Sequence, residues 1–131
     1  MSMGEKNVKH PWEWIDGLGL LVAAGIVMVG LFALVQPIMG AALFGAPLTS
    51  AGDQRWVRIG GIRDIALGLV LTVPLLLRQR RIAGMLILFA AIIPAGDACI
   101  VFFATGVNHN MLMHASVVVY MVVLGVLFLR R

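Results

Sequence analysis

The segment Arg58–Leu77 reads RIGGIRDIALGLVLTVPLLL, a mostly apolar stretch that contains an adjacent arginine and aspartate. A helix of about twenty residues crosses the hydrocarbon core of a bilayer, so this segment has the length of a membrane span. A charged side chain at the centre of a span costs about 2.5–3.5 kcal/mol or more, and such residues usually mark a functional site. We therefore place the centre of a candidate site at Arg63 and Asp64 and expect the rest of the chain to shelter it.

The composition of the whole chain indicates a membrane protein. Of its 131 residues, 61% are hydrophobic and 12% are charged, and the mean hydropathy is +1.01. A soluble domain of this size cannot bury that much apolar surface, whereas a membrane protein exposes it to lipid. We predict one all-α domain over residues 1–131, an integral protein of the plasma membrane or of a bacterial inner membrane. Nucleic acid is not an expected partner, because the basic residues gather at the ends of the apolar segments, where they set topology.

The apolar segments predict four transmembrane helices, approximately at residues 15–36, 57–77, 82–104 and 111–129. Residues 37–56, which are rich in Gly, Ala and Pro, are predicted to form a long outer loop, either a plain connector or a lid over a pocket. Pro94 cannot donate a backbone hydrogen bond to Ala90, so the third helix should bend one turn before Asp97.

Basic residues are distributed unevenly between the two ends of the predicted helices. Arg55 and Arg58 lie at one end, and the other end carries Lys6, Lys9, Arg78, Arg80, Arg81, Arg130 and Arg131. The positive-inside rule therefore predicts that both termini are cytoplasmic and that the 37–56 loop faces outward. Trp12 and Trp14 are expected at the membrane interface, which indole rings favour.

Polar residues from all four predicted helices are expected in one layer of the outer half of the membrane. At a rise of about 1.5 Å per residue, Arg63 and Asp64 lie about 9–10 Å below the outer end of the second helix. Asp97 lies about 10 Å and His114 about 5–7 Å below the same surface, and Gln36 comes from the outer end of the first helix. This shared depth predicts a site built by several helices.

Small and charged residues are arranged on the second predicted helix so that another helix can pack against it. Gly60, Asp64 and Gly68 share one face, so a neighbouring helix is expected to approach the carboxylate closely. Arg63 either extends to the outer surface or pairs with Asp64 or Asp97. We favour the pair, because two carboxylates at this depth need a cation or a proton.

The candidate catalytic residues are Asp97, Asp64, Arg63 and His114. Asp97 is interpreted either as a hydrogen-bond partner of the backbone freed by Pro94 or as a working acid or base. Burial and a nearby arginine act on a carboxyl pKa in opposite directions, which can divide two aspartates into an acid and a base. His114 either relays protons or donates a hydrogen bond near the start of its helix.

Four further residues are candidate substrate contacts: Gln36, Phe44, Arg58 and Tyr120. Tyr120 is also interpreted as an aromatic residue of the helix packing. No metal is assigned, because the acidic residues and the histidine lack a spaced ligand motif. No cofactor is assigned either, because phosphate-loop and dinucleotide glycine patterns do not occur. The single cysteine, Cys99, permits no internal disulfide.

Several of these residues form an ordered pattern: Pro37, Phe44-Gly45 and Pro47, then Gly61-Ile62-Arg63-Asp64 and Gly68, then Gly96-Asp97, then His114-Ala115. With this pattern the chain, from Gly17 to Leu129, resembles a family of small four-helix membrane proteins classed as a domain of unknown function, which is distantly similar to the DoxX-like proteins. The resemblance implies a four-helix fold and a common site for the four candidate catalytic residues, but no reaction. Small multidrug exporters are similar in size, but their glutamate within the first helix has no counterpart here.

Three functions are compatible with these features. The first is a site that binds a lipophilic substrate and isomerises, cyclises or hydrolyses it, with Asp97 or Asp64 as acid or base and Arg63 stabilising negative charge. The second is a proton-coupled carrier that works as a homodimer, because four helices alone enclose little space. The third is an accessory subunit whose polar residues hold helices or a partner together.

Overall fold

The computed structural model describes residues 11–48 and 50–131, and helices with short connections make up this part of the chain, with no strand. In chain order the helices are α1 (Trp14–Val35), α2 (Pro37–Leu43), α3 (Ala51–Leu76), α4 (Arg80–Ala90), α5 (Ile92–Thr105) and α6 (His109–Arg130). The helices α4 and α5 together make one span, so the described chain has four segments long and apolar enough to cross a membrane. The predicted all-α bundle with four spans is thus confirmed. The predicted positions of Lys6 and Lys9 lie outside the described residues.

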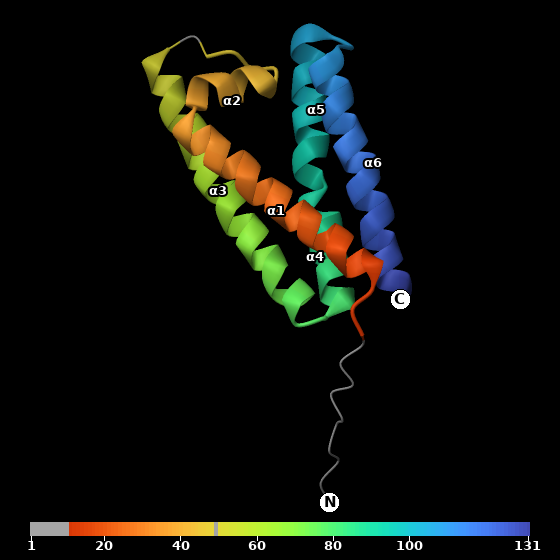
Figure 1. The fold of residues 1–131 in the computed structure, drawn as a ribbon. Coiled ribbons are helices and arrows are strands. Elements are labelled where there is room, and N and C mark those ends of the chain that lie inside the picture. The colour runs from red at the N-terminus through yellow and green to blue at the C-terminus, as the bar shows by residue number, and fades with distance from the viewer. Residues whose placement is uncertain (1–10, 49) are drawn as a thin grey trace, which may run out of the picture.

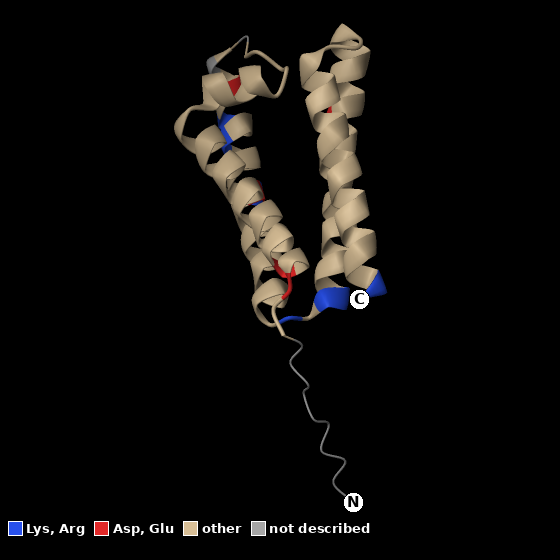
Figure 2. Cartoon of the chain, turned by 45° about the vertical axis from the view of Figure 1, so that its right-hand side comes forward, with Lys and Arg blue, Asp and Glu red and all other residues tan. Residues whose placement is uncertain are grey.

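The spans are arranged as two groups, which Figures 1 and 2 show as separate columns that diverge toward α2. In the first group α1 packs along α3, and in the second α4 and α5 pack along α6. Both the start of α1 and the end of α6 lie at the end of the bundle that carries Arg78, Arg80, Arg81, Arg130 and Arg131, which we call the basic end. The opposite end, which α2 crosses, is called the α2 end.

The first group is held by a very close approach of α1 to α3. A Cβ atom at Gly30 would lie 2.5 Å from the carbonyl oxygen of Gly61, and one at Gly61 would lie 2.5 Å from that of Gly30. A Cβ at Gly68 would likewise meet the carbonyl oxygen of Ala23, at 2.8 Å. Gly60 faces open space. The predicted close-packing face was therefore correct for Gly68 and wrong for Gly60, because the neighbouring Gly61 is turned toward α1.

The predicted 37–56 loop is mostly helical, because its turn-forming residues act as helix caps. Pro37 begins α2, where its missing N–H costs nothing. Gly45, with φ of +80°, ends α2: its N–H donates to the Ala42 carbonyl, and the Ala46 N–H donates to the Ala41 carbonyl, as in a Schellman motif.

The helix after this connection begins at Ala51, six residues before the predicted start at 57. Ser50 and Asp53 form a capping box at its start, since the Ser50 hydroxyl accepts a hydrogen bond from the Asp53 N–H and the Asp53 carboxylate accepts one from the Ser50 N–H. The serine and aspartate three positions apart were the sequence signal for this earlier start. Residues 44–50 alone connect α2 to α3.

The third span is interrupted where Pro94 predicts a disturbance. The helix α4 ends at Ala90 and α5 begins at Ile92, with Ala91 between them. Pro94 has no N–H to donate to the Ala90 carbonyl, so the helical hydrogen-bond ladder is broken at this turn. The break lies at the centre of the bundle and places Asp97 on the following turn of α5.

Candidate functional site

A cavity of about 660 Å³ lies between the two groups of helices. Its walls come from α1, α3, the α4–α5 junction and α6, and the residues after α2 close it toward the α2 end. Most of the lining is apolar, with Val22, Ile26, Leu67, Ile93, Val117 and Met121 among the residues that line it. The titratable side chains of the lining are Asp64, Asp97, His114 and Tyr120. The cavity is therefore mostly apolar, with a small polar region formed by the aspartates and the histidine.

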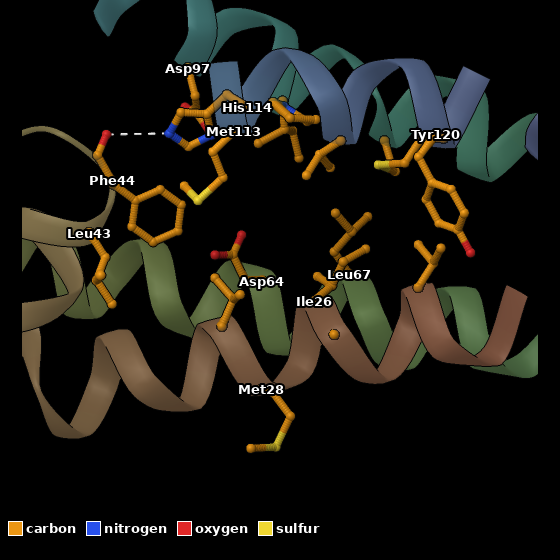
Figure 3. A pocket seen from close by; sticks show the side chains of 18 of the residues that line it. Ile26, Met28, Leu43, Phe44, Asp64, Leu67, Asp97, Met113, His114 and Tyr120 are labelled. Carbon is orange, nitrogen blue, oxygen red and sulfur yellow. Dashed lines mark hydrogen bonds between the residues drawn. The ribbon is translucent and has the colours of Figure 1, made fainter. Parts of the chain in front are cut away.

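Two aspartates enter the cavity from opposite groups of helices. Figure 3 shows the Asp64 carboxyl pointing from α3 into the cavity, and Asp97 on α5 beside His114. Both side chains are half-buried, and neither makes a hydrogen bond or an ion pair with another described residue. Because α3 begins at Ala51, Asp64 lies about 20 Å along that helix, so its predicted depth of about 9–10 Å was too shallow.

His114 lies on α6, contacts Phe44 at the end of α2 and is buried, with 3% of its surface exposed. Its ring stacks on Phe44 with centroids 5.5 Å apart and planes 20° apart, and its Nε2 lies 3.3 Å from the Phe44 carbonyl oxygen. A carbonyl only accepts, so Nε2 carries the hydrogen of this bond. In the neutral ring Nδ1 then remains as an acceptor, and it has no partner among the described residues.

Three residues predicted for the site do not line the cavity. Arg63, Gln36 and Arg58 are all exposed and absent from its walls. The predicted ion pair of Arg63 with Asp64 or Asp97 is not formed within the described chain. The reason is helical geometry: Arg63 lies about 100° around α3 from Asp64, and with Asp64 facing the cavity its neighbour faces outward. The role of Arg63 in stabilising negative charge is therefore dropped.

The other two predicted contacts do line the cavity. Phe44 covers it at the α2 end, and Tyr120 lies farther along α6, toward the basic end. The structure thus brings together Asp64, Asp97, His114, Phe44 and Tyr120, which come from α3, α5, α6 and the segment after α2.

A second polar cluster, at the basic end, was not predicted as a structural unit. Arg80, which is 7% exposed, donates from Nε to Asp16 Oδ1 at 3.0 Å and from a terminal nitrogen to Asp16 Oδ2 at 2.7 Å. It also donates to Glu13 Oε1 at 2.8 Å and to the Pro11 carbonyl oxygen at 2.9 Å. Asp16 is 1% exposed and also accepts from the Glu13 N–H at 2.8 Å. This cluster ties α1 to α4 at the basic end, where the two groups of helices converge.

Two further arginines and two tryptophans surround this cluster. Arg131 pairs with the other carboxylate oxygen of Glu13 at 2.6 Å and lies over the Trp14 ring, 5.6 Å from its centroid. Arg78 lies 5.2 Å from the centroid of the Trp12 ring. The hydrogen bond from Arg80 is the main cause that lowers the pKa of the Glu13 carboxyl, so this group stays ionised at neutral pH. The described residues contain no group of three His, Cys, Asp or Glu side chains able to hold a metal ion.

Comparison with known proteins identifies a family for the chain. A family model described as a domain of unknown function (DUF4267) matches residues 23–128, a range that contains Asp64, Asp97 and His114. No curated protein and no solved structure matches the chain. The expected distant similarity to DoxX-like proteins stays a prediction.

Proposed function

We propose, for a chain that belongs to the family described as a domain of unknown function (DUF4267), that the cavity binds a lipophilic substrate within the membrane and carries out acid–base chemistry on it. The observation that carries the proposal is the convergence of Asp64, Asp97 and His114, from three different helices, on one otherwise apolar cavity. Titratable side chains inside membrane proteins are costly, and they mark sites of proton exchange or substrate binding.

The size and the polarity of the cavity suit a small lipophilic molecule. Its volume of about 660 Å³ lies within the range of about 300–1,000 Å³ that is typical of ligand pockets. An apolar wall with a few polar groups is also the usual composition of such pockets, where the polar groups orient the ligand. A substrate dissolved in the bilayer would reach this site without leaving the apolar phase.

The three titratable groups are placed for proton transfer on two sides of a bound molecule. Nδ1 of His114 is available as a base, because the Phe44 carbonyl holds the hydrogen-bearing Nε2 in place. Asp64 faces the cavity from the other group of helices and, when protonated, would act as the acid. His114 or Asp97 would take a proton from one atom of the substrate, and Asp64 would give a proton to another. The two transfers together isomerise the substrate, with no net gain or loss of protons.

A proton-coupled carrier is the second candidate. It is favoured by the position of Asp64 on one group of helices and of Asp97 and His114 on the other, since relative motion of the groups would change the distance between these side chains.

An accessory role has less support. Polar residues that hold helices together are hydrogen-bonded to each other. Arg80 and Asp16 are bonded in this way, whereas Asp64 and Asp97 are not.

Orientation in the membrane is part of the proposal. The concentration of arginines at the basic end supports a cytoplasmic location for both ends of the chain. The end of the cavity that Phe44 covers would then face away from the cytoplasm.

Filling the cavity tests whether it binds lipophilic molecules. We expect that a photoreactive alkyl probe, offered with an ammonium, hydroxyl or carboxylate head group, labels cavity-lining residues in the purified full chain with at least one of the three head groups. Gly25 lines the cavity, and a Cβ there meets no atom within 4 Å, so the side chain of Gly25→Leu begins in open space and occupies part of the cavity. This variant should lower cavity labelling about tenfold, as expected for a loss of about 1.4 kcal/mol of binding.

Gly17→Leu is the matched control for that experiment. It makes the same change on the same helix, also without a neighbour within 4 Å, but Gly17 does not line the cavity. Labelling is measured by mass spectrometry of peptides, relative to the lipid-facing Ile100. Equal labelling of the cavity in the two variants, or no cavity labelling of the unmodified protein with any head group, would refute the binding function.

Hydrogen exchange tests the chemistry itself. The protein in D₂O, supplied with a lipophilic extract of the membrane that contains it, should introduce deuterium at carbon into its substrate, because a base that removes a proton returns one from solvent. Asp97→Asn is expected to slow this incorporation by about 10²–10⁴-fold, the usual contribution of one acid–base group. Asp53→Asn, which removes an equal charge at the start of α3, should leave it unchanged. Incorporation at the same rate in Asp97→Asn would remove the role assigned to Asp97.

A further inference from the structure

The polar groups that line the cavity carry negative charge and hydrogen-bond acceptors but no permanent positive charge. Asp64 and Asp97 contribute two carboxyl groups, and none of the lining residues is a lysine or an arginine. Neither carboxyl group has a partner among the described side chains. Charged groups within a membrane protein are normally compensated by an opposite charge or by a proton. Apart from the imidazole of His114, which lies beside Asp97, no described side chain at this site supplies that compensation, so the rest has to come from the solvent or from a ligand.

The imidazole of His114 gives a second, independent indication, because one of its nitrogens can accept a hydrogen bond from an N–H or O–H group of a ligand. Although the residue is 3% exposed, Nδ1 has no hydrogen-bond partner within the described part of the chain. The other ring nitrogen is already engaged by the Phe44 carbonyl. The described residues contain no fully buried side-chain nitrogen or oxygen without a partner, so Nδ1 is accessible from the cavity that His114 lines. A ligand in the cavity that carries an N–H or O–H group can donate a hydrogen bond to it.

The same region offers an aromatic face. The Phe44 ring stacks on His114, and Figure 3 shows it on the same side of the cavity region as the Asp64 carboxyl. The face of an aromatic ring attracts an ammonium group, most strongly where water is excluded. Farther along α6 the lining becomes apolar, and Tyr120 lies six residues, or about 9 Å, beyond His114. The cavity thus has a head region, at Asp64, Asp97, His114 and Phe44, and an apolar tail region.

We propose that the ligand of this cavity is an amphiphilic cation, an ammonium group on an apolar body, with its nitrogen in the head region and its hydrocarbon part in the tail region. The inference rests on the proposed function, because it names the class of molecule that the same site takes. One carboxylate neutralises the ammonium group, and the other carboxyl remains available for proton exchange. A carboxylate or phosphate on the ligand would bring a further negative charge beside Asp64 and Asp97, which is unfavourable.

The experiment compares the three photoreactive probes, which share one alkyl chain and differ only in the head group. In an uncharged detergent at pH 7, the ammonium probe is expected to label the cavity-lining residues at least about tenfold more than the hydroxyl or carboxylate probe, relative to labelling of Ile100. Equal or stronger labelling by the hydroxyl or carboxylate probe would overturn the inference but leave the binding function intact. No cavity labelling by any of the three would overturn both.

Variants of the two aspartates test whether the carboxyl groups cause the preference for the ammonium probe. Asp64→Asn and Asp97→Asn should each lower the preference for the ammonium over the hydroxyl probe about tenfold, without reducing labelling by the hydroxyl probe. Asp53→Asn removes the same charge outside the cavity and should keep the preference. An unchanged preference in both cavity variants would contradict the inference. The comparison of probes on the unmodified protein decides the matter even where a variant fails to fold.

Competition identifies the source of the ammonium group. Dodecylamine represents a free amine, and phosphatidylethanolamine represents the same group on a membrane lipid. We expect displacement of the ammonium probe by dodecylamine, because the head region offers no positive charge to a lipid phosphate. Displacement by phosphatidylethanolamine but not by dodecylamine would assign the site to a lipid head group and overturn the proposal that the ligand is a free amine. If neither compound displaces the probe, the proposal of an ammonium ligand is wrong.

Discussion

Arg80→Met is expected to lower the free energy of unfolding by about 3–5 kcal/mol, the cost of removing one partner from a buried ion pair. Arg80 donates two hydrogen bonds to Asp16, whose side chain is 1% exposed, so the substitution leaves that carboxylate buried without its cation. It also removes the hydrogen bonds from Arg80 to Glu13 and to the Pro11 carbonyl. Unfolding by a denaturing detergent, titrated into mixed micelles, measures the change.

Arg81→Met is the matched control for Arg80→Met. Arg81 is the next residue of the same helix, carries the same charge and is exposed. Its replacement should change the unfolding free energy by no more than about 0.5 kcal/mol, as for other surface positions. In the double variant Asp16→Asn with Arg80→Met, the loss should be smaller than the sum of the two single losses, because no charge is left unpaired. Equal losses for Arg80→Met and Arg81→Met would show that the cluster does not hold α1 to α4.

The contrast between Arg80 and Arg81 shows what could be predicted from the sequence. Apolar length and composition decide that the chain forms four membrane spans, and helix geometry decides that Asp64 and Arg63 face in different directions. Both arginines were interpreted as signals of topology. The partner of Arg80 is 64 residues away in the chain, and no local pattern indicates which of two adjacent arginines is turned inward. The structure distinguishes the two roles, because it shows that the start of α4 brings Arg80 to Asp16 on α1.

The titratable residues of the candidate site could be predicted from the sequence, but the cavity that they line could not. Asp64, Asp97 and His114 were found because a titratable group inside a span needs an explanation. The cavity that they share depends on the divergence of two helix groups, which spacing along the chain does not indicate. The expected pairing of Arg63 with an aspartate failed, because charge balance was assumed to lie within the protein. The absence of that pair is what points to a cationic ligand.

Gly61→Ala is expected to lower the free energy of unfolding by about 1–3 kcal/mol, the usual cost of overpacking a close contact. The new methyl group would lie 2.5 Å from the Gly30 carbonyl oxygen and 3.2 Å from the Leu34 backbone nitrogen. Both are backbone atoms of α1 and cannot move aside by changing a rotamer, so α1 and α3 must separate. In a membrane protein this matters more than usual, because helix association there depends on close van der Waals packing rather than on the hydrophobic effect.

Gly60→Ala provides the control at the adjacent position. A Cβ at Gly60 meets nothing within 4 Å, and alanine favours a helix over glycine by about 0.8–1.0 kcal/mol, so this variant should be neutral or more stable. Because Asp64 follows Gly61 by one turn of α3, separation of the helices should also shift that carboxyl relative to Asp97 and weaken cavity labelling by the ammonium probe. We therefore expect Gly61→Ala to reduce both stability and labelling, and Gly60→Ala to reduce neither. If the two variants behave alike, the packing of α1 on α3 does not position the site.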